Sequence, residues 1–129
     1  METKRATSLT VKVEAKPGTL SKIAAQLRDA GVNCLGLWAF NMGPDAAEAI
    51  IIPENAAKAK SVLQGARSST AFLLFGEDKV GVLCPTLDAI AKAGINLEAV
   101  GALGVGGRCA TCIWPRDEDV DKVAKILGA

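Results

Sequence analysis

A Cys-x-x-Cys pair, Cys109 and Cys112, is the first pattern in this chain that could do chemistry. Cysteines at this spacing are typical of redox pairs and of half a zinc site. The surrounding residues predict a strand, however, and residues three apart on a strand point to opposite faces. A zinc site would also need two further ligands, and Cys34 and Cys84 fall on another predicted strand and a predicted helix. We therefore expect small apolar core residues here, with no metal and no redox function.

Histidine is absent, and the charges nearly balance at 15 basic and 14 acidic residues. The chain therefore lacks the commonest general base, the commonest metal ligand and the Ser-His and Cys-His nucleophile pairs. No pair of carboxylates on one element replaces them. We expect no enzyme activity, no catalytic residues and no cofactor. The charge balance does not indicate binding to nucleic acid or to a membrane surface.

Three further motifs are better explained by local structure. The acidic run from Asp117 to Asp119 lies at a predicted helix start, where acids stabilise the helix dipole, and Asp117 is the expected cap. The glycine-rich stretch 101–107 lies between two predicted strands and lacks the Lys-Ser/Thr ending of a phosphate loop, so we expect a hairpin turn over 104–107. The strand aromatics Trp38, Phe40 and Trp114 lack basic flanks, which favours core or interface packing over base stacking.

The elements that must position any site occur twice. At a spacing of 63 residues the chain repeats Gly18 and Gly81, Leu20 and Leu83, Ala30 and Ala93, Gly31 and Gly94, and Asn33 and Asn96. Further on, Ile52-Pro53 corresponds to Trp114-Pro115 after a deletion of one residue. A long match interrupted by one deletion indicates a duplication.

Each copy predicts the order strand, helix, strand, strand, helix. In the first copy these are strand 9–15, a helix from Leu20 closed by Gly31, strand 32–40, a turn over 41–45, strand 46–52 and a helix capped by Asn55. In the second they are strand 71–75, helix 81–93, strands 96–103 and 109–114, and a final helix. This order predicts an α+β fold of two ferredoxin-like units, residues 1–67 and 68–129, each an antiparallel sheet with helices on one face.

A complete ferredoxin-like unit needs a fourth strand, and neither copy leaves room for one after its second helix. We expect the fourth strands to be missing or shared. Residues 68–76 would form a strand that serves both halves, and the N-terminal strand or a second copy of the chain would complete the other sheet.

The strand followed by Pro17-Gly18-Thr19-Leu20 and, later, by Ala30-Gly31-Val32-Asn33 resembles the signature of ACT domains, and the resemblance extends from about Leu9 to Leu127. The chain also looks like small free-standing tandem-ACT proteins. The second copy departs from the pattern, because Val80 replaces the turn proline. The resemblance implies that a small molecule, usually an amino acid, binds near the turn between the first strand and the first helix, at an interface between ACT units.

The candidate ligand-binding residues follow from that placement: Lys16, Pro17, Gly18, Thr19, Leu20 and Asn33 in the first copy, and Asp78, Lys79, Val80, Gly81, Val82, Leu83 and Asn96 in the second. A helix start offers unpaired amides and partial positive charge for a carboxylate. The asparagines can both donate and accept, and Asp78 could hold an ammonium group. Each residue also has a structural explanation, because glycines serve turns and loop charges are usually solvated.

Three functions remain open. We favour a sensor that binds an amino acid and acts on a partner enzyme or on its own oligomer, and we expect a homodimer. The alternative is an assembly module that needs no ligand. An enzyme is the third and is disfavoured by the missing histidine. The charged start of the chain, Met1 to Arg5, leads into no long apolar stretch, so we expect no membrane association and a cytoplasmic location.

Overall fold

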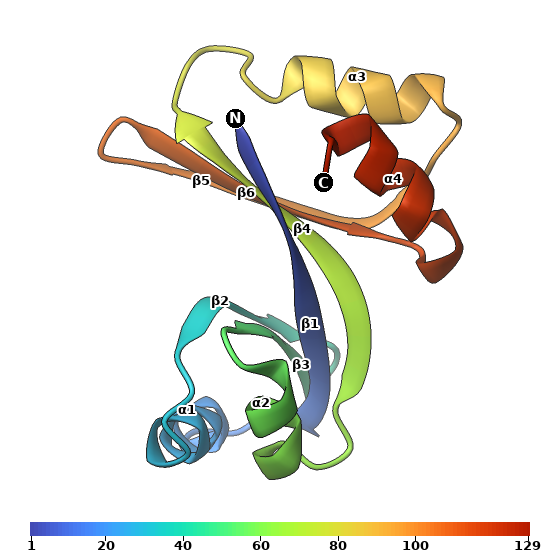
Figure 1. The fold of residues 1–129 in the computed structure, drawn as a ribbon. Helices are drawn as coiled ribbons and strands as arrows, with labels where there is room; N and C mark the ends of the chain where they lie inside the picture. The colour runs from blue at the N-terminus through green and yellow to red at the C-terminus, as the bar shows by residue number, and fades with distance from the viewer. The chain divides into compact units, whose positions relative to one another are not determined.

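The computed structural model describes all residues, Met1–Ala129, and has the expected α+β fold (Figure 1). Its elements are β1 (Glu2–Glu14), α1 (Thr19–Asp29), β2 (Cys34–Asn41), β3 (Ala46–Pro53), α2 (Ala56–Val62), β4 (Arg67–Glu77), α3 (Cys84–Lys92), β5 (Leu97–Val105), β6 (Arg108–Pro115), the 3₁₀ turn η1 (Asp117–Asp119) and α4 (Val120–Leu127). The strand order is β2-β3-β1-β4-β6-β5.

The chain forms two compact units, which we call the first unit (residues 7–69) and the second unit (residues 1–6 and 70–129). The first unit contains α1 and α2, and the second contains α3 and α4. Within each unit the two helices cover one face of the strands (Figure 1). The sequence-based division assigned residues 1–6 to the first half and placed the boundary after residue 67. In the structure, residues 1–6 belong to the second unit and the boundary follows residue 69.

The expected sharing of strands is confirmed. The second unit takes residues 70–77 of β4 together with the first residues of β1, whereas the first unit takes residues 67–69 of β4. The N-terminal segment is held in the second unit by side chains: the Arg5 guanidinium lies over the Phe72 ring, 5.9 Å from its centroid, and 3.8 Å from Asp121. β1 therefore begins seven residues before the expected start at Leu9. The prediction was wrong there because residues 2–7 do not alternate between polar and apolar.

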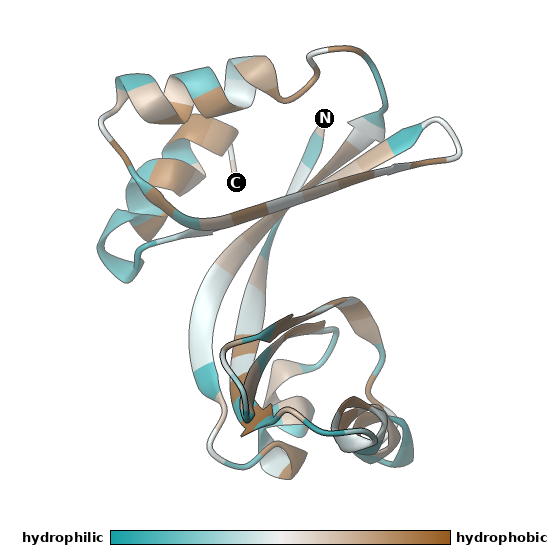
Figure 2. Ribbon diagram, turned by 180° about the vertical axis from the view of Figure 1, so that it is seen from behind, coloured by the Kyte–Doolittle hydropathy of each residue, from teal (hydrophilic) through white to brown (hydrophobic).

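Alternating strand residues and one stripe of each helix build a separate core in each unit. In the first unit, Leu9 and Ile51 from the strands pack with Leu27 of α1 and are almost fully buried. In the second, Phe72 and Ile113 pack with Val123 of α4. Figure 2 shows the corresponding mixture of hydrophilic and hydrophobic residues along the helices. Full burial of a Leu, Ile or Phe side chain contributes roughly 1.5–3 kcal/mol to the free energy of folding, so each cluster stabilises its own unit.

The first helix of each unit ends in the same way. Gly31 and Gly94 both adopt left-handed backbone conformations, with φ of +70° and +72°. After α1, Val32 N donates to Leu27 O at 2.9 Å; after α3, Ile95 N donates to Ile90 O at 3.3 Å. These six-to-one bonds define the Schellman motif, which explains why glycine follows both helices.

The two second helices begin differently. Asn55 caps α2 as expected, because its side-chain oxygen accepts from Lys58 N at 3.0 Å. The expectation that Asp117 caps the last helix is wrong. Asp117 opens the 3₁₀ turn η1 instead, and no side chain caps either η1 or α4. The acids of η1 still precede the positive end of α4, where negative charge is favourable.

Two boundaries in the second copy are later than expected. α3 begins at Cys84 rather than Gly81, with Pro85 in its first turn, where a missing amide hydrogen costs nothing. The β5–β6 hairpin turns at Gly106 and Gly107, whose φ values of +59° and +79° fit a two-residue turn of type I′. Gly104 lies within β5, so the turn is shorter than the predicted 104–107.

Candidate ligand-binding site

The bend between β1 and α1 opens a helix without a side-chain cap. Gly18 has a φ of +90°, which side chains other than glycine rarely tolerate. Lys22 N donates to Gly18 O at 2.9 Å, which starts the helical hydrogen bonding. Because no side chain caps α1, its first-turn amides and the positive end of its dipole face the bend without an anionic partner from the chain.

A groove borders this bend within the first unit and measures about 500 Å³. Its lining comes from β1, the bend, α1 and the end of α2: Val11, Val13, Glu14, Lys16, Pro17, Gly18, Thr19, Lys22, Ile23, Gln26, Val62, Leu63 and Gln64. Val11 and Ile23 are buried members of the first unit's core, so the groove has an apolar floor. An apolar surface with a few polar groups around it is typical of small-molecule sites.

Lys16 is held beside the groove by an ion pair. Its Nζ lies 2.8 Å from Glu14 Oε2, and both side chains are exposed. Hydrogen bonding to Lys16, with the charge attraction second, lowers the pKa of Glu14 below its ordinary value; the same contact raises the pKa of Lys16. Both groups therefore stay charged at neutral pH. The second copy repeats the pair, with Lys79 Nζ 3.0 Å from Glu77 Oε2.

A smaller groove of about 390 Å³ lies at the corresponding place in the second unit. Its lining is Met1, Thr3, Leu74, Val82, Pro85, Thr86, Ala89, Ile126 and Leu127. No charged side chain is among these residues. The two grooves therefore share a position in the fold and differ in chemistry.

The structure brings together only part of the predicted ligand-binding set. In the first copy Lys16, Pro17, Gly18 and Thr19 line the groove, whereas Leu20 and Asn33 do not. Asn33 follows the far end of α1, and eleven helical residues span ~16 Å. The Asn33 carbonyl accepts from Glu54 N at 2.9 Å. A small ligand at the bend is therefore out of reach of Asn33 in the same unit.

The second copy's predicted residues are more dispersed. Only Val82 lines that unit's groove, whereas Lys79, Gly81, Leu83 and Asn96 do not. Val80 is fully exposed. Asp78 lies against the β5–β6 hairpin, where its carboxylate would be 2.6 Å from a Cβ on Gly104. That contact favours a glycine at this position near the end of β5.

Sequence reasoning missed four polar residues that line the first groove: Glu14, which pairs with Lys16, and Lys22, Gln26 and Gln64. A signal was present for two of them. Lys22 and Gln26 are three and seven residues after Thr19, so the three share one face of α1. Gln64 follows the end of α2, and nothing in the sequence indicated that it would approach α1.

The Cys-x-x-Cys pair is divided between the two faces of β6, as predicted. Cys109 pairs with Gly76 and Cys112 with Leu73, so the two alternate along the strand. Both are buried, and all four cysteines are free. Burial raises the pKa of Cys112 to about 12, which keeps its thiol protonated at neutral pH.

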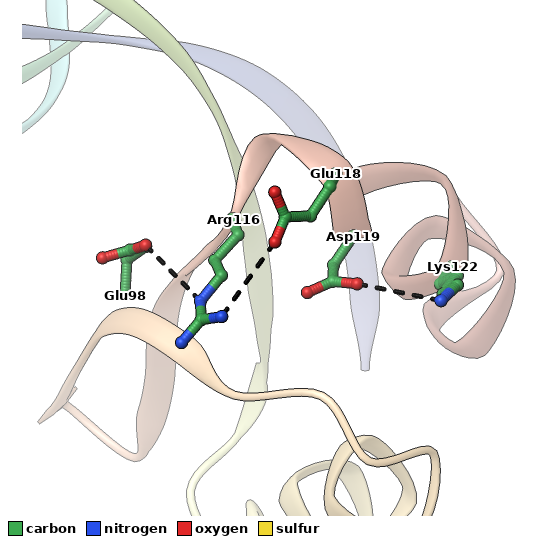
Figure 3. Close-up of polar contacts among 5 residues, drawn as sticks. All are labelled: Glu98, Arg116, Glu118, Asp119 and Lys122. Atoms are coloured by element: carbon green, nitrogen blue, oxygen red, sulfur yellow. Dashed lines mark ion pairs between the residues drawn. The ribbon is translucent and has the colours of Figure 1, made fainter.

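Two of the three acids in the run, Glu118 and Asp119, form ion pairs with basic side chains (Figure 3). Arg116 bridges the strands to the turn: its guanidinium lies 3.7 Å from Glu98 and 4.0 Å from Glu118. Lys122, in the first turn of α4, lies 4.0 Å from Asp119. The arrangement fits charges that orient the start of a helix.

The aromatic residues of the strands differ in exposure. Trp114 is buried, whereas the Trp38 ring is partly exposed and lies over Gly36, where an added Cβ would be 2.6 Å from the ring. Phe40 is half-exposed. Nowhere in the chain do three or more acidic or cysteine side chains gather as metal ligands. None of the four helices has the length and apolar character needed to cross a membrane.

The fold matches solved structures closely, although the sequences have diverged. A protein from Bacteroides thetaiotaomicron is 18% identical, with a TM-score of 0.85 over 98% of this chain and 88% of that one. The ligand-free regulatory subunit of aspartate kinase from Thermus thermophilus is 16% identical, with a TM-score of 0.68 over 98% and 93% of the two chains. The corresponding subunit from Thermus flavus is 14% identical, with a TM-score of 0.65 over 98% and 94%.

No family model and no curated protein matches the sequence. At these identities the structural matches define the fold. The fold is the tandem ACT type, and the resemblance noted in the sequence is confirmed at that level.

Proposed function

We propose that this chain is a regulatory protein that binds a small molecule, an amino acid or a close relative, at the bend between β1 and α1 in the first unit. The groove there carries the proposal, because it combines an apolar floor with an uncapped helix start and several polar side chains. The shared fold with regulatory subunits of aspartate kinase supports the same role. The protein has no catalytic part in this account and acts in the cytoplasm.

A regulatory protein must transmit its bound state to a second copy or to a partner enzyme. A ligand does so only to the extent that it binds one state better than the other. The outer strands β2 and β5 are suited to such contacts, since both are edges of the sheet and carry exposed apolar side chains. We propose that the protein forms a homodimer through one of these edges and regulates a metabolic enzyme.

The edge residues also favour the second candidate, an assembly module without a ligand. Six of the exposed apolar residues form three pairs 63 residues apart: Leu37 and Val100, Phe40 and Leu103, and Met42 and Val105. Phe40 is 51% exposed and Leu103 is 68% exposed. Solvent-facing apolar residues retained at matching positions in both copies indicate a selected contact surface.

A thermal-shift screen over the twenty amino acids, organic acids and phosphorylated metabolites separates the two candidates. A regulator gains ~2.7 kcal/mol of stability at one hundred times the dissociation constant of its ligand. We expect at least one compound to raise the melting temperature. Sedimentation of the wild type and of Phe40→Lys and Leu103→Lys measures the assembly separately. No shift with any compound, together with a dimer disrupted by either lysine, would leave only the assembly module.

A further inference from the structure

The two corresponding grooves have different residue types at three positions of the first helix and its start. At the 63-residue spacing, Thr19 corresponds to Val82, Lys22 to Pro85 and Gln26 to Ala89. At these three positions a polar residue of the first groove is replaced by an apolar one, whereas at a fourth the apolar Ile23 is replaced by the polar Thr86. Gly18 and Gly81 keep the same left-handed backbone, so the two copies retain the bend and differ in the side chains around it.

Lys22 supplies a cationic group that the chain itself leaves without a counter-ion. Glu14, the acidic residue of the first groove, is bound to Lys16 at 2.8 Å. Lys22 has no carboxylate within 4.0 Å, and it lies one turn from the positive end of α1. The groove therefore holds two lysines against one glutamate, with one lysine available to an anion.

The hydroxyl of Thr19 is a second polar group without a partner from the chain. Thr19 lines the groove, yet its Oγ1 is buried without any hydrogen-bond partner. A buried polar atom without a hydrogen-bond partner destabilises the folded state. Val82 has no such group.

The surroundings of the first groove add positive charge. An adjoining groove of about 680 Å³ shares Val11 and Gln64 with the first and is lined by Lys12 and Arg67 against a single acid, Glu48. Each groove therefore has two basic residues for one acidic residue. The charge distribution favours an anionic occupant that has an apolar part for the floor.

From these observations we infer that the first unit's groove, and not the second's, binds a small organic acid whose carboxylate or phosphate is held by Lys22 and the start of α1. The inference rests on the proposed function, which it restricts to one unit and one ligand class. Gln26 and Gln64 then provide hydrogen bonds to the rest of the molecule. A charge-assisted hydrogen bond is stronger than a neutral one, so Lys22 dominates the affinity.

The test is a titration of the ¹⁵N-labelled full chain, followed through its backbone amides, with L-aspartate, succinate, inorganic phosphate and the neutral isostere succinamide. We expect an acid to shift amides 18–26 and leave amides 81–89 unchanged, and succinamide to have no effect. A response to phosphate alone assigns the acid group as a phosphate, and a response to aspartate or succinate assigns it as a carboxylate. Either assignment supports the inference.

The matched variants are Lys22→Gln and Lys60→Gln. Lys22→Gln removes a positive charge from an exposed position in the groove, and Lys60→Gln removes one from an exposed position outside it. We expect at least tenfold weaker binding of the responding acid to Lys22→Gln and unchanged binding to Lys60→Gln. Shifts centred on residues 82–89, undiminished binding to Lys22→Gln, or no response to any of the acids would overturn the inference. A neutral metabolite that stabilises the protein in the thermal-shift screen would in that case leave the proposed function standing.

Discussion

At the residue scale, the four cysteines differ most in their accessibility. Cys84 is exposed in the first turn of α3, whereas Cys109 and Cys112 are buried on opposite faces of β6. Reactivity requires a solvent-accessible thiolate. With a pKa raised to about 12 by burial, Cys112 has almost no thiolate at pH 8.

We therefore expect a maleimide to label Cys84 in the native protein first, and Cys109 and Cys112 only after denaturation. Mass spectrometry of peptides from native and denatured samples measures the order, and Cys84→Ser is the control that removes the fast site. Formation of a Cys109–Cys112 disulfide under mild oxidation, with the native fold retained, would contradict the strand geometry and favour a redox function for the Cys-x-x-Cys pair.

The residues of the candidate site were only partly predictable from the sequence. The bend at Gly18 could be found, because Pro-Gly punctuation and the repeat both mark it. Lys22 and Gln26 were overlooked because a helix face becomes a groove wall only when another element stands opposite it. That element is the end of α2 with Gln64, and its approach to α1 depends on tertiary packing.

At the element scale, helix ends were predictable wherever one residue type is required by backbone geometry. Gly31 and Gly94 terminate their helices as expected, because only glycine adopts the left-handed conformation without strain. Helix starts that depend on a side-chain hydrogen bond were harder to predict. Asn55 and Asp117 are both good capping types, and only Asn55 forms the bond.

A matched pair of substitutions tests this difference. Asn55→Ala removes the acceptor for Lys58 N and should lower the free energy of unfolding by about 1 kcal/mol. Asp117→Ala removes no capping bond and should cost only a few tenths of that through the helix dipole. Urea unfolding curves give both values. Equal losses from the two variants would show that Asp117 caps its helix in solution.

On the scale of the whole molecule, the sequence predicted the duplication and the need to share strands, but not the length of β1. Residues 2–7 do not alternate between polar and apolar types, so their sequence does not predict a strand. The segment is placed instead by contacts of Arg5 with Phe72 and Asp121 and by Met1 beside Gly76. The residues in these contacts are separated by between 67 and 116 positions in the sequence, so the contacts leave no local signal.

Deleting residues 2–6 should therefore destabilise the second unit selectively. The fourth strand of that unit is lost, so amide hydrogen exchange should speed up along β4 and β6 and remain unchanged in α1 and β3. Arg5→Ala should produce a weaker form of the same pattern. Faster exchange confined to α1 and β3 would show that the N-terminal segment belongs to the first unit.

We infer that two copies of one fold have diverged, so that the first unit binds a small organic acid and the second keeps the same bend beside a groove without charged side chains. Isothermal titration calorimetry of the intact protein, with the acid that raises the melting temperature most, measures how many molecules bind to each chain. We expect one molecule per chain and at least tenfold weaker binding to Lys22→Gln. Two molecules per chain with equal affinity, or undiminished affinity in Lys22→Gln, would contradict this inference.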